Sequence, residues 1–218
     1  MTDFSLWDIA RALLVAARWT VLLSVLAFVA GGVLGLLFLM VRISRRRWLH
    51  TAGWAYIELF QGTPLLAQLF LAFFGLPLTG IETSALTAAG LALALWSAAF
   101  LAEIWRACLE AIPRAQWEAS ASLGMTYPQQ MRHVILPQAA RIAIPPTVGF
   151  AVQVVKGTAL ASVIGFAELS RASTMIANAS FQPLTAYGCA ALLYFVLCWP
   201  LSKASRLLEK RLDEARHS

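Results

Sequence analysis

The run WTVLLSVLAFVAGGVLGLLFLMV, residues 19–41, contains no charged side chain. A helix needs about 20 consecutive apolar residues to cross the hydrocarbon of a bilayer, so this run predicts a membrane-spanning helix. Four further apolar runs follow, at about 54–76, 85–108, 142–166 and 184–201. We therefore expect an all-α integral membrane protein with about five transmembrane helices.

The composition of the 218 residues supports this expectation. The chain is 60% hydrophobic and 13% charged, and its mean hydropathy is +0.71. A soluble domain carries about twice that share of charged residues. Five spans with short connections occupy the chain and leave no room for a soluble catalytic domain. The cysteines Cys108, Cys189 and Cys198 form no CxxC pair and are interpreted as small core residues.

Basic residues gather after the first, third and fifth runs, and this predicts the topology. These residues are Arg42, Arg45, Arg46 and Arg47, then Arg106, Arg114, Arg132 and Arg141, then Lys203, Arg206, Lys210, Arg211 and Arg216. Positive charge marks the cytoplasmic side of a membrane, so the N-terminus is expected outside and the C-terminus in the cytoplasm. The net charge of +6 then reflects topology and contact with anionic membrane lipid, and indicates no nucleic-acid partner.

The charge and hydropathy pattern divides the chain into three parts. Residues 1–17 predict an N-terminal interfacial helix, residues 18–205 the transmembrane domain, and residues 206–218 a cytoplasmic tail. Within the domain, residues 109–141 form a long polar connection between the third and fourth spans.

Polar side chains inside the spans mark candidate sites, because such groups usually face a cavity or a partner. In the second span, Glu58 and Gln61 share a stripe with Gln68, and Thr63-Pro64 predicts a kink. The stripe indicates either a transport path or polar helix packing. The Gly31 and Gly35 pair of the first span is instead a signature of close helix packing.

The third and fourth spans carry the other polar groups. Trp96, Phe100 and Glu103 lie at helical spacing on one face of the third span. Glu103 is a candidate partner for a substrate ammonium group, or alternatively for Arg106 three residues on.

In the fourth span, Gln153, Lys156 and Gly157 share a face with Gly149. The Pro145-Pro146 pair and Gly157 predict a helix broken at membrane depth, as is found where a chain lines a cavity. A tight helix crossing is the alternative, because it also favours glycine.

The polar connection 109–141 predicts two short helices, over residues 117–123 and 127–135. Gly124 is expected to end the first with a left-handed residue, and Pro137 to interrupt the second. Such a pair of helices indicates either a docking element for a partner or an amphipathic linker on the membrane.

The motif Glu118-Ala119-Ser120, followed by Gly124 and by Leu136-Pro137, resembles the EAA loop of ABC importer permeases. Ser120 and Val134 are mild departures from that motif. Residues 112–119, 56–58, 62–66, 161–165 and 168–169 are similar to the histidine, glutamine, arginine and cystine permeases of the polar amino acid family. Gln61, Trp96, Phe100 and Gly157 depart from it, standing where arginine, asparagine, tyrosine and aspartate are common.

The resemblance implies a type I ABC importer permease in a bacterial inner membrane. It implies two separate ATPase subunits that bind ATP and magnesium, a second permease that is a copy or a relative, and a periplasmic amino-acid-binding protein. The EAA loop would be the coupling helix, with Glu118 capping a short helix start.

This chain has no GxxxxGK[ST] motif of its own, so no cofactor and no enzymatic activity are expected on it. On the outer side, Glu168, Ser170, Arg171 and Asn178 would meet the binding protein. The alternative function is a stand-alone ion-coupled carrier or channel that uses Glu103 and Lys156.

Overall fold

The computed structural model describes residues 5–44 and 46–217, apart from the side chains of 213 and 215–217. Those residues fold into helices joined by short turns, and they include no β-strand. Residues 1–4, Arg45 and Ser218 lie outside the described residues, as does the side chain of Arg216. Residues 1–4 belong to the predicted interfacial segment, Arg45 to the basic cluster after the first span, and Arg216 and Ser218 to the predicted tail.

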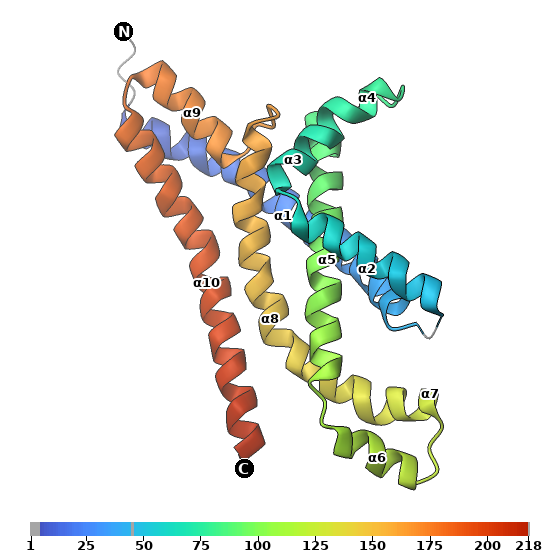
Figure 1. The fold of residues 1–218 in the computed structure, drawn as a ribbon. Helices are drawn as coiled ribbons and strands as arrows, with labels where there is room; N and C mark the ends of the chain where they lie inside the picture. The colour runs from blue at the N-terminus through green and yellow to red at the C-terminus, as the bar shows by residue number, and fades with distance from the viewer. Residues whose placement is uncertain (1–4, 45, 218) are drawn as a thin grey trace.

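The first helix, α1 (Leu6–Arg42), begins at Ser5. The Ser5 hydroxyl accepts the backbone N–H of Asp8, and the Asp8 carboxylate accepts the N–H of Ser5, which completes a capping box. Helix α1 has no break near residue 17, so the predicted interfacial segment and first span form one helix. At 1.5 Å per residue α1 is about 55 Å long. It crosses the bundle obliquely, as a helix longer than the bilayer must (Figure 1).

The second span is bent, as its Thr63-Pro64 pair predicts. It consists of α2 (Arg47–Gly62), α3 (Leu65–Phe70), the π-helical turn η1 (Leu71–Gly75) and α4 (Leu76–Leu78). The axis turns by 102° between α2 and the following segment. Thr63 and Pro64 are both extended, because proline disfavours the helical conformation of the residue before it.

Helix α5 (Ala85–Glu110) lies at the centre of the bundle and is the most buried span. Its partner is α1, which packs closely along it through two glycines. A Cβ at Gly31 would lie 2.5 Å from the Ser97 Cβ, and one at Gly35 would lie 3.1 Å from the Ala98 carbonyl oxygen. The expected close-packing role of Gly31 and Gly35 is therefore confirmed.

The connection 109–141 forms α6 (Arg114–Ser122), α7 (Tyr127–Gln130) and the π-helical turn η2 (Met131–Ile135), which continues directly into α8 (Leu136–Gly157). The prediction that Pro137 interrupts the helix is wrong. The wider π turn ends at Ile135, so Pro137 stands in the first turn of α8. Proline is tolerated there although it lacks a backbone N–H and carries a bulky ring. Residues 127–157 thus form one continuous helix, which bends between α7 and the long part of α8 and which we call the 127–157 rod (Figure 1).

The predicted break at Pro145-Pro146 is also wrong, because both prolines lie inside α8. The Ser205 hydroxyl of α10 donates to the Pro145 carbonyl at 2.8 Å, and α10 packs along α8 here. The part of the prediction that concerns Gly157 is confirmed, because the regular helix ends there and the 3₁₀ turn η3 (Thr158–Ser162) follows.

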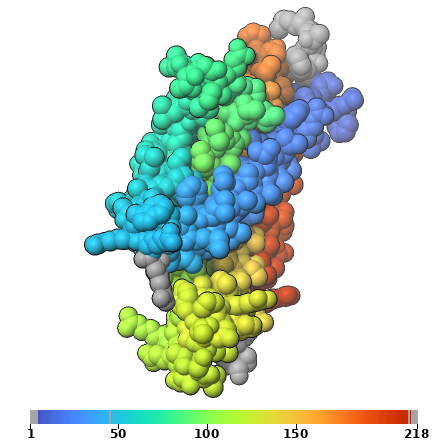
Figure 2. Space-filling view, turned by 90° about the vertical axis from the view of Figure 1, so that its right-hand side faces the viewer, coloured from blue at the N-terminus to red at the C-terminus, as the bar shows by residue number. Residues whose placement is uncertain are grey.

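The last two helices are α9 (Leu169–Ser180) and α10 (Pro183–His217). Helix α9 was not predicted, because polar residues interrupt its apolar positions. The tail is a continuation of α10. Helices α4 and α9 lie at one end of the molecule, and α6 and α7 project at the opposite end (Figures 1 and 2).

Among the described residues, four helices are long and apolar enough to cross a membrane, and the bent α2–α4 segment gives a fifth when counted as one span. The fold is therefore the predicted all-α membrane protein with about five transmembrane helices.

The glycine contact between α1 and α5 generates a stability prediction. Gly31→Ala should lower the free energy of unfolding by about 1–3 kcal/mol, because the methyl group overpacks against Ser97. Gly32→Ala is the control, since its nearest neighbour would be the Trp105 Cη2 atom at 4.0 Å. Thermal unfolding of the purified protein in detergent measures both. Equal unfolding temperatures for the two variants would contradict the prediction.

Candidate functional site

A helical hairpin, residues 114–135, projects from one end of the bundle (Figure 1). Its turn depends on Gly124, which has a φ of +73° that L side chains rarely adopt. Thr126 then caps α7 in a reciprocal capping box with Gln129. The predicted left-handed end at Gly124 is confirmed.

A hydrophobic cluster packs the hairpin onto the bundle. Buried Ile112, Ile135 and Ala139 form its centre, and Trp117 packs against it. The Trp117 and Tyr127 rings stack with their centroids 6.1 Å apart, which joins the two arms of the hairpin. A displacement of α6 is therefore passed to the base of α8.

The residues of the predicted coupling motif occupy different environments on this hairpin. Glu118 and Ala119 are exposed, whereas Ser120 is 3% exposed and donates to the Trp117 carbonyl oxygen. Leu136 and Pro137 are exposed at the start of α8. Glu118 lies in the middle of α6, which begins at Arg114, so its expected role as a cap at a helix start is wrong.

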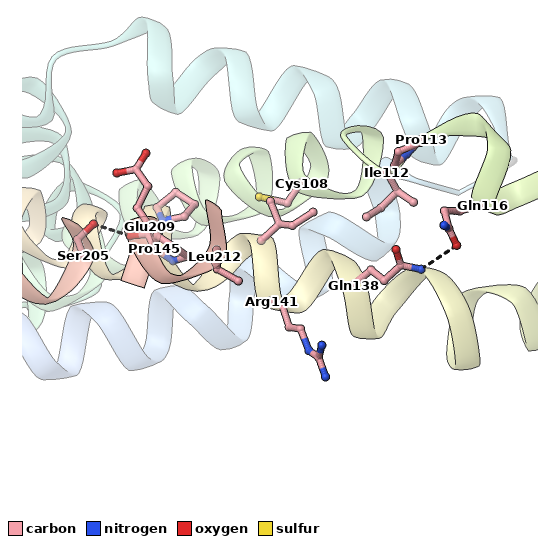
Figure 3. A pocket seen from close by; sticks show the side chains of 12 residues that line it. Cys108, Ile112, Pro113, Gln116, Gln138, Arg141, Pro145, Ser205, Glu209 and Leu212 are labelled. Carbon is pink, nitrogen blue, oxygen red and sulfur yellow. Dashed lines mark hydrogen bonds between the residues drawn. The ribbon is translucent and has the colours of Figure 1, made fainter. Parts of the chain in front are cut away.

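A cavity of about 690 Å³ lies beside the hairpin, between α5, α8 and α10. Figure 3 shows Gln116 and Gln138 at one end of this cavity, where the Gln138 amide donates to the Gln116 side chain at 3.3 Å. The Arg141 side chain points away from the other labelled residues. Pro145 and Pro146 of α8 contribute to the wall. Among the described residues, no three His, Cys, Asp or Glu side chains lie close enough to hold a metal ion.

The aromatic residues of the candidate path meet between α5 and α8. The Trp96 ring lies 5.2 Å from the Phe150 ring, and Phe100 stacks on Phe150 with centroids 5.5 Å apart. A Cβ at Gly157 would lie 3.3 Å from Leu65 and 4.0 Å from Trp96. The second, third and fourth spans therefore converge at the end of α8.

The polar candidates of the second and fourth spans lie on exposed faces. Glu58, Gln61, Gln153 and Lys156 are all exposed, although each lies in an apolar segment. The Gln61 amide donates to the Ala99 carbonyl oxygen at 3.4 Å, which connects α2 to α5. Because lipid offers such side chains no partner, their exposure indicates a face directed at protein or water.

Glu103 is engaged within α5 itself. Its carboxylate accepts two hydrogen bonds from the Arg106 Nε and one from Nη2, the last at 2.5 Å. Arg106 also forms an ion pair with Glu110. The structure thus contains the alternative predicted for Glu103, a pair with Arg106.

Glu168 was expected on the outer surface, and that expectation is wrong. Its side chain is fully buried, at 0% exposure, among α1, α9 and α10. Burial raises the pKa of the Glu168 carboxyl, and hydrogen bonds from Ser170, Tyr194, Arg171 and Thr20 oppose this effect. Sequence reasoning missed this site because nothing in the polar run 167–183 shows that a third helix covers it.

Curated proteins similar to this chain are named as permease proteins for the transport of amino acids. The chain is 38% identical to the probable amino-acid ABC transporter permease protein YckA of Bacillus subtilis, over 88% of this chain and 85% of the relative. It is 37% identical to the L-cystine transport system permease protein TcyB of the same organism, over 89% and 84%.

Solved structures give the same result. A crystal structure of an amino acid ABC transporter with histidines matches with a TM-score of 0.91 at 35% identity, over 97% of this chain and 99% of that one. The MetNI methionine ABC transporter, at 22% identity and a TM-score of 0.75, shares the fold. The family model described as "Binding-protein-dependent transport system inner membrane component" matches residues 27–214. The chain therefore belongs to the family of inner-membrane components of binding-protein-dependent transport systems.

Proposed function

We propose that this permease subunit forms half of the translocation path of an ABC importer for a polar amino acid. The observation that carries the proposal is the hairpin of residues 114–135, which projects from the bundle and continues into the 127–157 rod. The far end of that rod, at Gly157, contacts the candidate path residues. One element therefore joins a projecting surface to the path.

Two partners follow from this arrangement. A separate ATPase subunit that binds ATP and magnesium would receive the hairpin, with Glu118 and Ala119 on its exposed surface. A second permease, either a copy or a relative, would cover the exposed face that carries Gln153 and Lys156. A periplasmic binding protein would deliver the amino acid to the opposite end of the bundle. The relatives named above are named as permease proteins of an amino-acid ABC transporter and of an L-cystine transport system, and neither is named as a stand-alone carrier or channel.

The path itself would use the residues that meet around Gly157. Lys156 supplies a positive charge for the substrate carboxylate, and Gln61, Gln153 and Glu58 offer hydrogen bonds. Trp96 and Phe100 supply an aromatic wall. Glu103 would contribute to the path indirectly, through its ion pair with Arg106. The N-terminus would be outside and the C-terminus in the cytoplasm, in agreement with the basic residues near the hairpin.

The proposal is tested by purifying the tagged chain in a mild detergent together with whatever it binds. ATP hydrolysis is measured with and without periplasmic extract and mixed amino acids. Stimulated ATPase activity that co-purifies with the chain is the expected result. An intact chain that purifies alone and without ATPase activity would refute the importer and favour an ion-coupled carrier.

The turn of the hairpin generates a coupling prediction. Gly124→Asp should insert normally and lose ATP-dependent uptake about tenfold, because it places strain of roughly 1–2 kcal/mol and a new charge at the docking surface. Uptake into proteoliposomes that contain the ATPase measures this. Gly80→Asp is the matched control, since Gly80 has a φ of +87° at the opposite end of the bundle. Normal uptake by Gly124→Asp at wild-type membrane levels, or an equal loss in Gly80→Asp, would contradict the prediction.

The candidate path generates a second prediction. Lys156→Gln should reduce amino-acid uptake by roughly 10- to 100-fold, because a hydrogen bond to a charged group contributes about 1.5–3 kcal/mol. Lys203→Gln, which removes an exposed lysine near the Trp199 ring, is the control and should transport normally. The initial rate of uptake as a function of amino-acid concentration measures the effect. Unchanged uptake by Lys156→Gln would remove Lys156 from the path.

A further inference from the structure

The buried Glu168 carboxylate joins three helices that are far apart in the sequence. Its Oε1 atom accepts the backbone N–H of Arg171 at 2.9 Å, which caps the start of α9. Its Oε2 atom accepts the Tyr194 hydroxyl of α10 at 2.7 Å and the Thr20 hydroxyl of α1 at 3.4 Å. We call this group of residues the Glu168 junction.

The Thr20 and Tyr194 hydroxyls make further contacts with the start of α9. The Thr20 hydroxyl also accepts the backbone N–H of Leu169 at 3.1 Å. The Tyr194 hydroxyl lies 2.9 Å from the Ser170 hydroxyl. Helix α1 and helix α10 therefore each hold the first turn of α9 at two points, and α9 is fixed in both position and direction.

The junction adjoins an apolar cluster. Ile9, Leu13, Leu169 and Ala190 are the buried members of this cluster, and Tyr194 packs against it. In such surroundings the loss of one hydrogen-bond partner leaves a buried carboxylate without compensation, which is strongly unfavourable. No ion pair to Glu168 occurs among the described side chains, so its hydroxyl and amide partners provide the compensation. The three helices are consequently expected to stay joined while other contacts change.

The position of the junction gives it a role in movement. The 127–157 rod begins at the hairpin, and its far end at Gly157 is followed by η3 and a turn at Gly165, with a φ of +87°. Glu168 follows that turn directly. The rod is therefore tied to α1 and α10 at the end opposite the hairpin.

We propose that Glu168 is a positioning residue for transport, which fixes the far end of the 127–157 rod so that a displacement of the hairpin tilts the rod. This inference rests on the proposed function, because it requires a partner that moves the hairpin. The Glu168 junction would be a fixed point on the side of the membrane opposite the hairpin.

The junction is tested with isosteric variants that remove one hydroxyl each, Thr20→Val and Tyr194→Phe, together with Glu168→Gln. Thr174→Val is the matched control, because the Thr174 hydroxyl donates to the Ser170 carbonyl oxygen and accepts the Tyr187 hydroxyl of α10 at 3.4 Å, but does not contact Glu168. Each chain is reconstituted with its ATPase in proteoliposomes. Amide hydrogen exchange over residues 168–175 reports whether α9 is held. Radiolabelled glutamine, histidine, arginine and cystine, supplied singly, report uptake per ATP hydrolysed.

The junction variants are expected to exchange roughly 10-fold faster over residues 168–175, because a bond to a charged group is lost. They should transport several-fold less amino acid per ATP while hydrolysing ATP at close to the wild-type rate. A purely structural role would reduce protein level and leave that ratio unchanged. The Tyr194→Phe and Glu168→Gln double variant should be no worse than the more affected single variant, since both changes disable one unit.

Three outcomes would overturn the role of Glu168. These are an unchanged uptake-to-hydrolysis ratio in Thr20→Val and Tyr194→Phe, an equal loss in Thr174→Val, or additive losses in the double variant. If Glu168→Gln fails to insert, the two hydroxyl variants decide the question. A wild-type complex without ATP-dependent uptake would instead refute the proposed function itself, so the two failures are distinguishable.

Discussion

The close contact between α1 and α5 is the constraint on which the rest of the structure depends. Neither helix gains from the hydrophobic effect inside a bilayer, so they associate through close packing where glycine removes the side chain. Gly31 and Gly35 bring the α1 backbone against Ser97 and Ala98. This contact places α5 at the centre of the bundle, and α2, α3 and α8 then pack against it.

The α8 rod connects the two ends of the molecule around that centre. At one end it continues from the hairpin through a π turn, and at the other it stops at Gly157 beside Leu65 and Trp96. Pro145 and Pro146 do not break it, because α10 packs along it and Ser205 bonds to its backbone. A continuous helical element with attachments at both ends can pass a displacement from one side of the membrane to the other.

The two ends of the rod are stabilised by different interactions. The hairpin end is held by apolar and aromatic packing around Ile135 and Trp117, which tolerates small rearrangements. The other end is held by the hydrogen bonds of the buried Glu168, which are directional and costly to break. This difference in the type of interaction is consistent with the proposed motion of the hairpin and a fixed point near α9.

The sequence by itself determined the membrane class, the number of spans, the Thr63-Pro64 bend, the Gly124 turn and the packing role of Gly31, because each depends on residues that are neighbours in the chain. The motif around Glu118 and Gly124 likewise indicated the family. Only the tertiary structure decided that α8 is unbroken, that Glu118 lies mid-helix, that Glu103 pairs with Arg106 and that Glu168 is buried. The continuity of α8 and the burial of Glu168 depend on contacts with distant helices, and no local pattern of polarity records which helix covers a given side chain.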